Sequence, residues 1–337
     1  MLDPQIPILT TVVGSYPVPQ WLRIQPTKSH LRDATLVVVR TQELAGIDVV
    51  ADGELYRYDL NHPETNGMIE YFVGQMSGID MQVTRADEQE FRKAQGMAYR
   101  AEPAGVVCGP IGPGTLNLPK AAQTLLEVAR HAKKFTLTSP YMLSKVLLDR
   151  YYGDRRALAM AIAEVLADQV ADLEVDIVQV DEANITGHPE DAEWAADAIN
   201  KVLDRVKAAP AVHLCFGNYG GQTIQRGHYD QLVTFMNSLH ADHVVLEMAR
   251  RDPLEQEYLR GLDDRLSLGI GVIDIKDNQV ETADQVAKRI EHAEKILGAG
   301  RVRYVHPDCG FWMLSRSVAD DKMRALVAGR DLWLGHH

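Results

Sequence analysis

The stretch ALAMAIAEVLADQVADLEVDIVQVDE, residues 157–182, passes directly from a helical pattern to a strand pattern. Residues 157–173 have the length and the apolar spacing of an amphipathic helix. The run DIVQVDE (176–182) is nearly continuous in Val and Ile before two acids, as expected for a strand buried on both faces of a sheet. A helix followed by a buried strand is typical of βα units, which build parallel sheets.

The same alternation extends over nearly the whole chain. The eight predicted strands are LTTVVG (9–14), IDVVADGE (47–54), KFTLTSP (134–140), DIVQVDE (176–182), AVHLC (211–215), HVVLE (243–247), LGIGVID (268–274) and RYVHPDC (303–309). Helical patterns separate them, including residues 30–46 and 282–300, which both end in glycine, a common helix C-cap. Eight such units favour a TIM (β/α)8 barrel over an open sheet, and no G-x-G-x-x-G motif follows the first strand. We therefore predict a single α/β barrel domain over residues 1–337.

One segment, residues 61–115, does not fit this alternation and has no clean helical pattern. Its stretch MQVTRADEQEFRKAQGMAYRAEPAGVVCG (81–109) resembles charged, alternating strands. We predict a β-rich insertion after the second strand, an antiparallel ribbon over one end of the barrel. The run AGVVCG (104–109) is assigned to this ribbon, with a ninth barrel strand as the alternative.

Composition excludes several classes of partner. The net charge is −12 and Lys and Arg do not cluster, which argues against nucleic acid. No apolar run approaches the roughly 18 to 20 residues of a membrane span, and the first residues lack the pattern of a signal peptide. The three cysteines, Cys108, Cys215 and Cys309, are odd in number and far apart, which indicates reduced thiols rather than a disulfide framework. The sequence predicts a cytoplasmic protein.

In TIM barrels the chemistry lies where strands end and βα loops begin. The residues at these predicted ends are Gly14-Ser15, Asp52-Gly53-Glu54, Asp181-Glu182, His213 and Cys215, Glu247, Asp274, and Asp308-Cys309. Because ionisable and metal-binding groups end strand after strand, the sequence predicts a functional site at this mouth of the barrel.

His213 and Cys215 are two residues apart on a strand, so both side chains leave the same face, with Cβ atoms roughly 6 to 7 Å apart. Imidazole and thiolate together suit zinc. Glu247 ends the next strand and Cys309 the last, so the four residues could form a mixed N, S, O, S site. A single buried His or Cys is more often a packing residue, but the combination at neighbouring strand ends favours zinc.

The motifs VVGSYP, DGE, VDE, HLCFGNY, VVLE, GVIDIK and HPDCG follow one another along the chain. In this order they resemble the C-terminal catalytic barrel of cobalamin-independent methionine synthase over nearly the whole length. The resemblance implies the zinc ligands His213, Cys215, Glu247 and Cys309, the same four residues that the strand ends select. It also implies that homocysteine binds to Ser15, Glu54 and Asp181. Two carboxylates would hold the ammonium group, and the hydroxyl with backbone N–H groups would hold the carboxylate.

Other readings of these substrate residues stay open on sequence alone. Ser15 could be a turn residue before Pro17, and Glu54 and Asp181 could be ion-pair partners of barrel arginines. In the zinc reading, the metal deprotonates and positions the substrate thiol, whose thiolate is the nucleophile. With four protein ligands, the thiol must displace one, Glu247, or expand the coordination shell.

The sequence departs from the family pattern in three ways. It starts directly at the catalytic barrel, as in a stand-alone core form. Lys276 stands in GVIDIK where the family has a proton-donating His, and it is either the general acid or an exposed lysine near a helix. The family's folate-stacking Trp is absent, and LTSPYMLSKVLL offers Tyr141 and Met142 instead. Trp21 and Trp312 could reach the mouth as stacking or packing aromatics.

The leading hypothesis is a zinc-dependent methyltransferase that makes methionine from homocysteine. The donor would be methyltetrahydrofolate, a methylcorrinoid or a methyl-carrier protein. The alternative is an epoxyalkane:coenzyme M transferase-like reaction, in which a zinc-bound thiolate opens an epoxide. A third reading is a non-catalytic module with structural zinc, but ligands spread from residue 213 to residue 309 argue against it.

Overall fold

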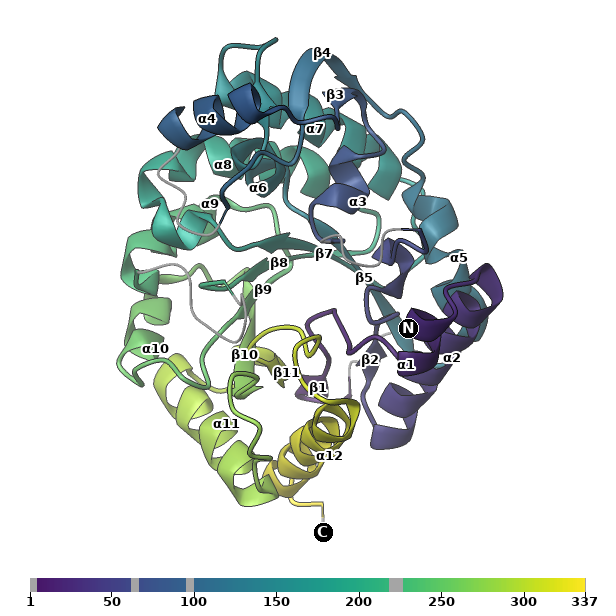
Figure 1. The fold of residues 1–337 in the computed structure, drawn as a ribbon. Helices are drawn as coiled ribbons and strands as arrows, with labels where there is room; N and C mark the ends of the chain where they lie inside the picture. The colour runs from purple at the N-terminus through teal and green to yellow at the C-terminus, as the bar shows by residue number, and fades with distance from the viewer. Residues whose placement is uncertain (1–4, 62–66, 95–99, 218–226, 337) are drawn as a thin grey trace.

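The computed structural model describes residues 5–61, 67–94, 100–217 and 227–336. Its main sheet has eight parallel strands in the order β1-β11-β10-β9-β8-β7-β5-β2. These strands are β1 Leu9–Thr10, β2 Val49–Val50, β5 Ala132–Thr138, β7 Ile177–Glu182, β8 Ala209–Leu214, β9 His243–Leu246, β10 Ser267–Ile273 and β11 Val302–Pro307. A parallel bridge between Thr11 and Val49 joins the two ends of this order and closes the barrel (Figure 1). The eight predicted strands and the TIM-barrel fold are confirmed.

Helices surround the barrel (Figure 1). They include α1 Gln20–Ile24, α2 Lys28–Ala45, α5 Leu118–Val128, α6 Pro140–Lys145, α7 Arg155–Val170, α8 Ala192–Leu203, α9 Val233–Ser238, α10 Glu255–Tyr258, α11 Ala283–Leu297 and α12 Arg316–Trp333. The predicted glycine cap of α2 is confirmed, since Gly46 has a left-handed φ of 87° and its N–H donates to the last turn. A capping box of Thr282 and Gln285 starts α11. None of the described helices is long and apolar enough to cross a membrane.

The barrel interior changes from apolar to polar along the strands. Its amino-terminal layer is a small apolar cluster, made of Leu9, Val49, Ala132, Ile177, Ala211 and Tyr304. One layer further along, the buried Lys134 ammonium donates to Val12 O and to Gln179 Oε1. Side chains two residues apart share a face of a strand, so Ile177, Gln179 and Asp181 of β7 lie on one face. Along this face the side chains change from apolar to polar to charged toward the carboxyl end of the strand. The polar end of the interior is therefore the end at which the loops meet.

A separate three-stranded sheet lies beside α7 at the periphery (Figure 1). β3 Ser77–Asp80 pairs antiparallel with β4 Val106–Gly112, and β6 Leu148–Asp149 pairs parallel with β4. A short helix, α3 Glu70–Val73, precedes this sheet. An antiparallel pair, β3 with β4, is thus present in this segment, and the run AGVVCG belongs to it, whereas a ribbon that covers one end of the barrel stays a prediction.

The prediction that this segment has no helix is wrong, because α4 spans Arg85–Ala94. Asp87 accepts hydrogen bonds from the N–H and hydroxyl of Thr84 at the start of this helix, and Phe91 packs with Val106 and Leu148 of the neighbouring strands. The charged residues are strong helix formers, so their propensity outweighed the apparent alternation. Residues 62–66 and 95–99 of the predicted insertion lie outside the described residues, and the domain boundaries stay a prediction.

Candidate metal and substrate site

Three predicted metal ligands meet at the carboxyl end of the barrel. His213 lies on β8 and Cys215 directly follows that strand, whereas Cys309 follows β11. The ligand atoms of His213, Cys215 and Cys309 all lie within 4.8 Å of one another. Cys215 and Cys309 are therefore brought together by closure of the barrel and not by proximity in sequence.

The histidine is oriented for coordination. His213 Nδ1 lies 3.0 Å from the carbonyl oxygen of Val245, a contact in which Nδ1–H donates. Nε2 is buried and has no hydrogen-bond partner in the part of the chain that the structure describes. A buried polar atom left without a partner costs about 1–3 kcal/mol, and a cation bound to its lone pair would remove that cost. One imidazole nitrogen and two sulfurs are a donor set that zinc prefers, so these residues fit a zinc ion.

Contact between the two cysteines shifts their pKa values in opposite directions. Contact with Cys215, and then with His213, lowers the pKa of Cys309 well below its ordinary value although burial acts against this. Contact with Cys309, together with burial, raises the pKa of Cys215. These surroundings favour the thiolate form of Cys309, which is the form of cysteine that binds metals.

Glu247, the fourth predicted ligand, lies beside this group but is not among the three residues whose ligand atoms converge within 4.8 Å, and its role as a ligand stays a prediction. Its Oε1 lies 2.5 Å from Lys276 Nζ, and its Oε2 accepts a 3.2 Å hydrogen bond from the N–H of Phe216. Each side chain of the Lys276–Glu247 pair is only 2% exposed. The alternative that Lys276 is an exposed lysine is therefore wrong.

The two predicted ammonium-binding carboxylates share a buried arginine. Arg57 Nη1 lies 3.2 Å from Glu54 Oε2, and its Nη2 lies 3.6 Å from Asp181 Oδ2. Thr136 donates a 3.0 Å hydrogen bond to Glu54 Oε1, and Gln179 donates a 2.7 Å hydrogen bond to Asp181 Oδ1. The arginine partner that sequence left open for these acids is Arg57.

Arg57 is the residue of this site that sequence reasoning missed. It ends a 3-10 turn, Leu55–Arg57, that directly follows Glu54. Side chains three residues apart eclipse one another in such a turn, so Arg57 faces Glu54. The available signal was the spacing D-G-E-x-x-R, residues 52–57, directly after a predicted strand.

Glu54 has an unusual backbone. Its φ is +60°, the only positive φ of a non-glycine residue in the described ranges. The Asp52 carboxylate accepts a 2.8 Å hydrogen bond from the N–H of Glu54 and stabilises this turn. Non-glycine residues rarely adopt this left-handed conformation, because it is strained. Where they do, the surrounding structure holds them in it, and such residues cluster at ligand sites.

Ser15 lies against the loop of Cys309. Its carbonyl oxygen accepts a 2.8 Å hydrogen bond from the N–H of Phe311. A Cβ added to Gly310 would lie 1.9 Å from Ser15 Oγ, and one added to Gly14 would lie 2.2 Å from Glu54 Oε1. The two glycines therefore permit the close approach of both predicted substrate residues, and Ser15 lies against the residue next to Cys309, a predicted metal ligand.

The register of the sheet places the predicted metal ligands next to the predicted ammonium-binding carboxylates. Asp181 on β7 is the direct partner of His213 on β8. Neighbouring strands lie about 4.8 Å apart, so a small ligand can reach both groups at once.

Sequence comparison places the chain in a family. A family model described as the catalytic domain of cobalamin-independent synthase matches residues 8–329. The chain belongs to this family. It is 28% identical to a methionine synthase of Thermococcus kodakarensis, covering 97% of this chain and 94% of the relative, and 29% identical to one of Sulfolobus acidocaldarius, covering 97% and 93%.

Solved structures agree on the fold. A B12-independent methionine synthase of a Shewanella species, in complex with selenomethionine, aligns with a TM-score of 0.80 at 24% identity over 96% of this chain and 97% of that one. A methyltransferase from Methanosarcina mazei aligns with a TM-score of 0.58 at 13% identity over 99% and 95%. Both likenesses show the barrel fold.

Asp308 fixes the loop that follows Glu247 in this synthase-family chain. Its Oδ1 accepts hydrogen bonds of 2.8 and 2.7 Å from the N–H groups of Met248 and Ala249, the two residues after Glu247. Burial, and then the charge of Glu247, raises the pKa of Asp308 to about 7. The sequence singled out Asp308 only as a strand-end acid, and its bond to the β9 loop becomes visible only in the folded chain.

The aromatic residues considered for the synthase donor site differ in exposure. Tyr141 is buried, donates a 2.8 Å hydrogen bond to Asp191, and packs with ring centroids 4.9 Å apart against Trp194. It is a packing residue. Trp21 and Trp312 are 37% and 45% exposed, and a stacking role for them stays a prediction.

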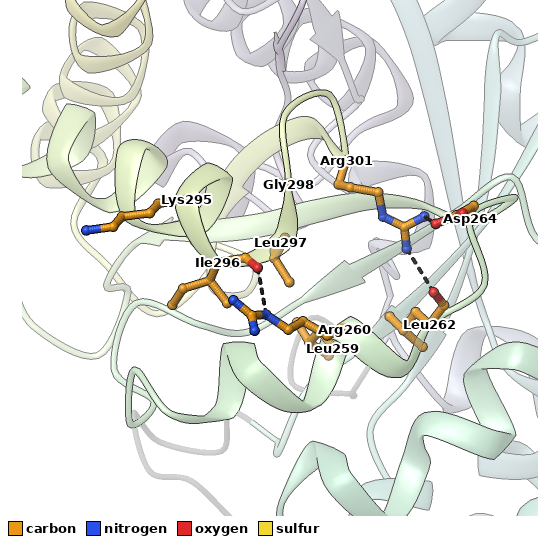
Figure 2. Close-up of a pocket in the computed structure, with 9 residues that line it drawn as sticks. All are labelled: Leu259, Arg260, Leu262, Asp264, Lys295, Ile296, Leu297, Gly298 and Arg301. Atoms are coloured by element: carbon orange, nitrogen blue, oxygen red, sulfur yellow. Dashed lines mark hydrogen bonds and ion pairs between the residues drawn. The ribbon is translucent and has the colours of Figure 1, made fainter.

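A surface cavity of about 260 Å³ (Figure 2) is lined by none of the residues of this synthase-family site. Its lining residues directly precede β10 and β11, at the amino ends of the strands. Arg260 and Arg301 donate to the carbonyl oxygens of Ile296 and Leu262 at 2.8 and 3.1 Å, so the guanidinium groups tie loops together. This end of a TIM barrel serves stability rather than chemistry.

Proposed function

We propose that this chain transfers a methyl group to the thiol of homocysteine and so forms methionine, with zinc held by His213, Cys215 and Cys309 and with Glu247 as a fourth ligand. The observation that carries this proposal is the meeting of an N, S, S donor set with two buried carboxylates on neighbouring strands. Homocysteine has a thiol and an ammonium group separated by a short carbon chain, which matches this juxtaposition. The methionine synthases named among the relatives support the same reaction.

When zinc is bound, it supplies the acidity that keeps a substrate thiol as a thiolate at neutral pH. The chain's own residues then bind and orient the amino acid. Glu54 and Asp181 accept hydrogen bonds from the ammonium group, and Ser15 donates to the carboxylate. Lys276 lies at this mouth, paired with Glu247, and is the proposed acid for the leaving group of the methyl donor. For that donor we retain methyltetrahydrofolate and a methylcorrinoid, free or on a carrier protein.

Ammonium binding should depend on the ionisation of Glu54. Burial, and then the neighbouring Asp181, raises the pKa of Glu54 from 4.5 to about 7 although Arg57 opposes this. Without ligand, the folded protein therefore loses stability as pH rises from about 4.5 to about 7, because the native state binds more protons than the unfolded chain there. An ammonium group needs the carboxylate, so ligand binding strengthens as pH rises through about 7.

L-methionine tests this prediction because it has the ammonium group and no thiol proton. We expect its affinity to fall about tenfold per pH unit below pH 7, with release of one proton on binding. Isothermal titration calorimetry in buffers of different ionisation enthalpy measures both quantities. Glu54→Gln should remove the proton release. An affinity that stays constant from pH 6 to pH 8 would show that Glu54 does not contact the ammonium group.

Optical titration of the cobalt-substituted protein tests the proposed function itself. Thiolate-to-cobalt charge transfer is expected with L-homocysteine and not with coenzyme M. A response to coenzyme M alone would contradict methionine formation and support the epoxide-opening reaction. Metal removal provides a second test, since a catalytic site leaves a folded, inactive barrel whereas structural zinc is required for folding.

A further inference from the structure

Gln179 connects the interior of the barrel to one of the predicted ammonium-binding carboxylates. It is buried on β7, two residues before Asp181 and on the same face of the strand. Its Oε1 accepts a 2.8 Å hydrogen bond from Lys134 Nζ. Its Nε2 donates to Val13 O at 3.0 Å and to Asp181 Oδ1 at 2.7 Å. Both ends of the side-chain amide are therefore engaged.

The chemistry of these partners selects one orientation of the amide. An ammonium group only donates, whereas a backbone carbonyl and a carboxylate only accept. Turning the Gln179 amide over would set its Oε1 against two acceptors and its Nε2 against a donor. Lys134 is itself fixed, because it is buried and also donates to Val12 O. One oxygen of Asp181 is consequently held by a donor that has no alternative arrangement.

The other oxygen of Asp181 faces Arg57 across a gap. Asp181 Oδ2 lies 3.6 Å from Arg57 Nη2, whereas a charge-assisted hydrogen bond between such groups is about 2.7–2.9 Å long. Arg57 is fixed by its own hydrogen bonds, since its Nε donates to Tyr56 at 2.7 Å and its Nη2 to Thr136 at 3.1 Å. The carboxylate is thus the group that could move to close the gap, and the bond from Gln179 opposes that movement.

We propose that Gln179 is a positioning residue that holds Asp181 back from Arg57 and so keeps this carboxylate available to the ammonium group of the substrate amino acid. The inference rests on the proposed function, because it takes an amino acid as the ligand. A carboxylate has about four acceptor positions, of which Gln179 uses one. Closure onto the Arg57 guanidinium would occupy further positions and would change the direction of those that remain.

Two ligands that differ in one group test the inference on the zinc-loaded chain. L-methionine has the ammonium group, and its desamino analogue carries hydrogen in its place. Gln179→Met keeps a long side chain and removes the donor. We therefore expect the affinity for L-methionine to fall about 10- to 100-fold, the range for a lost hydrogen bond to a charged group. The affinity for the desamino analogue should change by no more than about twofold. Isothermal titration calorimetry measures both affinities.

The chain offers a matched control for this substitution. Gln169 on α7 accepts a 2.8 Å hydrogen bond from the N–H of Leu118 in the outer layer of helices. Gln169→Met should bind both ligands like the unsubstituted chain. Thermal unfolding establishes that each variant is folded. Gln179→Asn keeps an amide in the interior but is too short to reach Asp181, so it carries the same expectation if Gln179→Met does not fold.

Crystal structures of the unsubstituted chain and of the Gln179 variant give a second measurement that needs no ligand. The separation of Asp181 and Arg57 should shorten from 3.6 Å to about 2.8 Å in the variant. A separation that does not shorten would overturn the inference. An unchanged affinity for L-methionine, or an equal loss for both ligands, would overturn it as well, because Gln179 would then not act through an ammonium-binding carboxylate.

Failure of the proposed function gives a different result. In that case L-methionine does not bind to the unsubstituted chain at all. The two crystal structures would then still decide whether Gln179 holds Asp181 back from Arg57.

Discussion

Cys309→Ser is expected to abolish methionine formation, with at least about a 100-fold loss of rate, and to release zinc during dialysis. A serine hydroxyl is a poor ligand for zinc compared with the thiolate that the fold already stabilises at Cys309. The barrel should remain folded, since the other groups at the site are fixed by strands and by their own hydrogen bonds. Metal content by elemental analysis, the rate of methionine formation and the melting temperature together check this result.

The chain contains a matched control for this substitution. Cys108 is exposed on β4, in the peripheral sheet and outside the three-ligand group. Cys108→Ser should retain the zinc content and rate of the unsubstituted protein. Full zinc content in Cys309→Ser, or an equal loss of rate in both variants, would contradict the assignment of Cys309 as a metal ligand.

Arg57→Met is expected to lower the free energy of unfolding by about 3–5 kcal/mol at pH 8, because it removes the ion-pair partner of the Glu54 and Asp181 carboxylates. The loss should be smaller at pH 5, where Glu54 is protonated, given its pKa of about 7. Homocysteine affinity should fall as well, since the guanidinium sets the separation of the two carboxylates. Urea unfolding at the two pH values measures the first effect, and titration of the cobalt form measures the second.

An exposed ion pair provides the control for Arg57→Met. Arg156 lies 2.6 Å from Asp197, and these side chains are 54% and 49% exposed. Because water screens such pairs, Arg156→Met should change the free energy of unfolding by less than about 1 kcal/mol at either pH. A comparable, pH-independent loss in both variants would show that Arg57 acts by packing its stem and not by its charge.

The strands and the three converging ligands were predictable because their signals are local. A strand buried on both faces must be continuously apolar, and DIVQVDE and HVVLE are recognisable from their own residues. In a parallel barrel all strand ends of one polarity face the same mouth, so His213, Cys215 and Cys309 follow from strand positions. The helix α4 was missed because its residues are mostly charged and include one large apolar side chain, Phe91, so the segment was interpreted as alternating strands.

The sequence by itself determined the barrel, the mouth at which its polar groups gather and the chemical types available there. Only the tertiary structure decided how these charged groups pair: Arg57 bridges Glu54 and Asp181, and Lys276 binds Glu247 beside the three ligands. The physical reason is that the pairing of buried charges depends on their distances and on their desolvation. At the mouth of the barrel a difference of a few ångströms determines which charged group is the partner. Residue order along the chain does not specify those distances. Strand order, loop conformation and burial do.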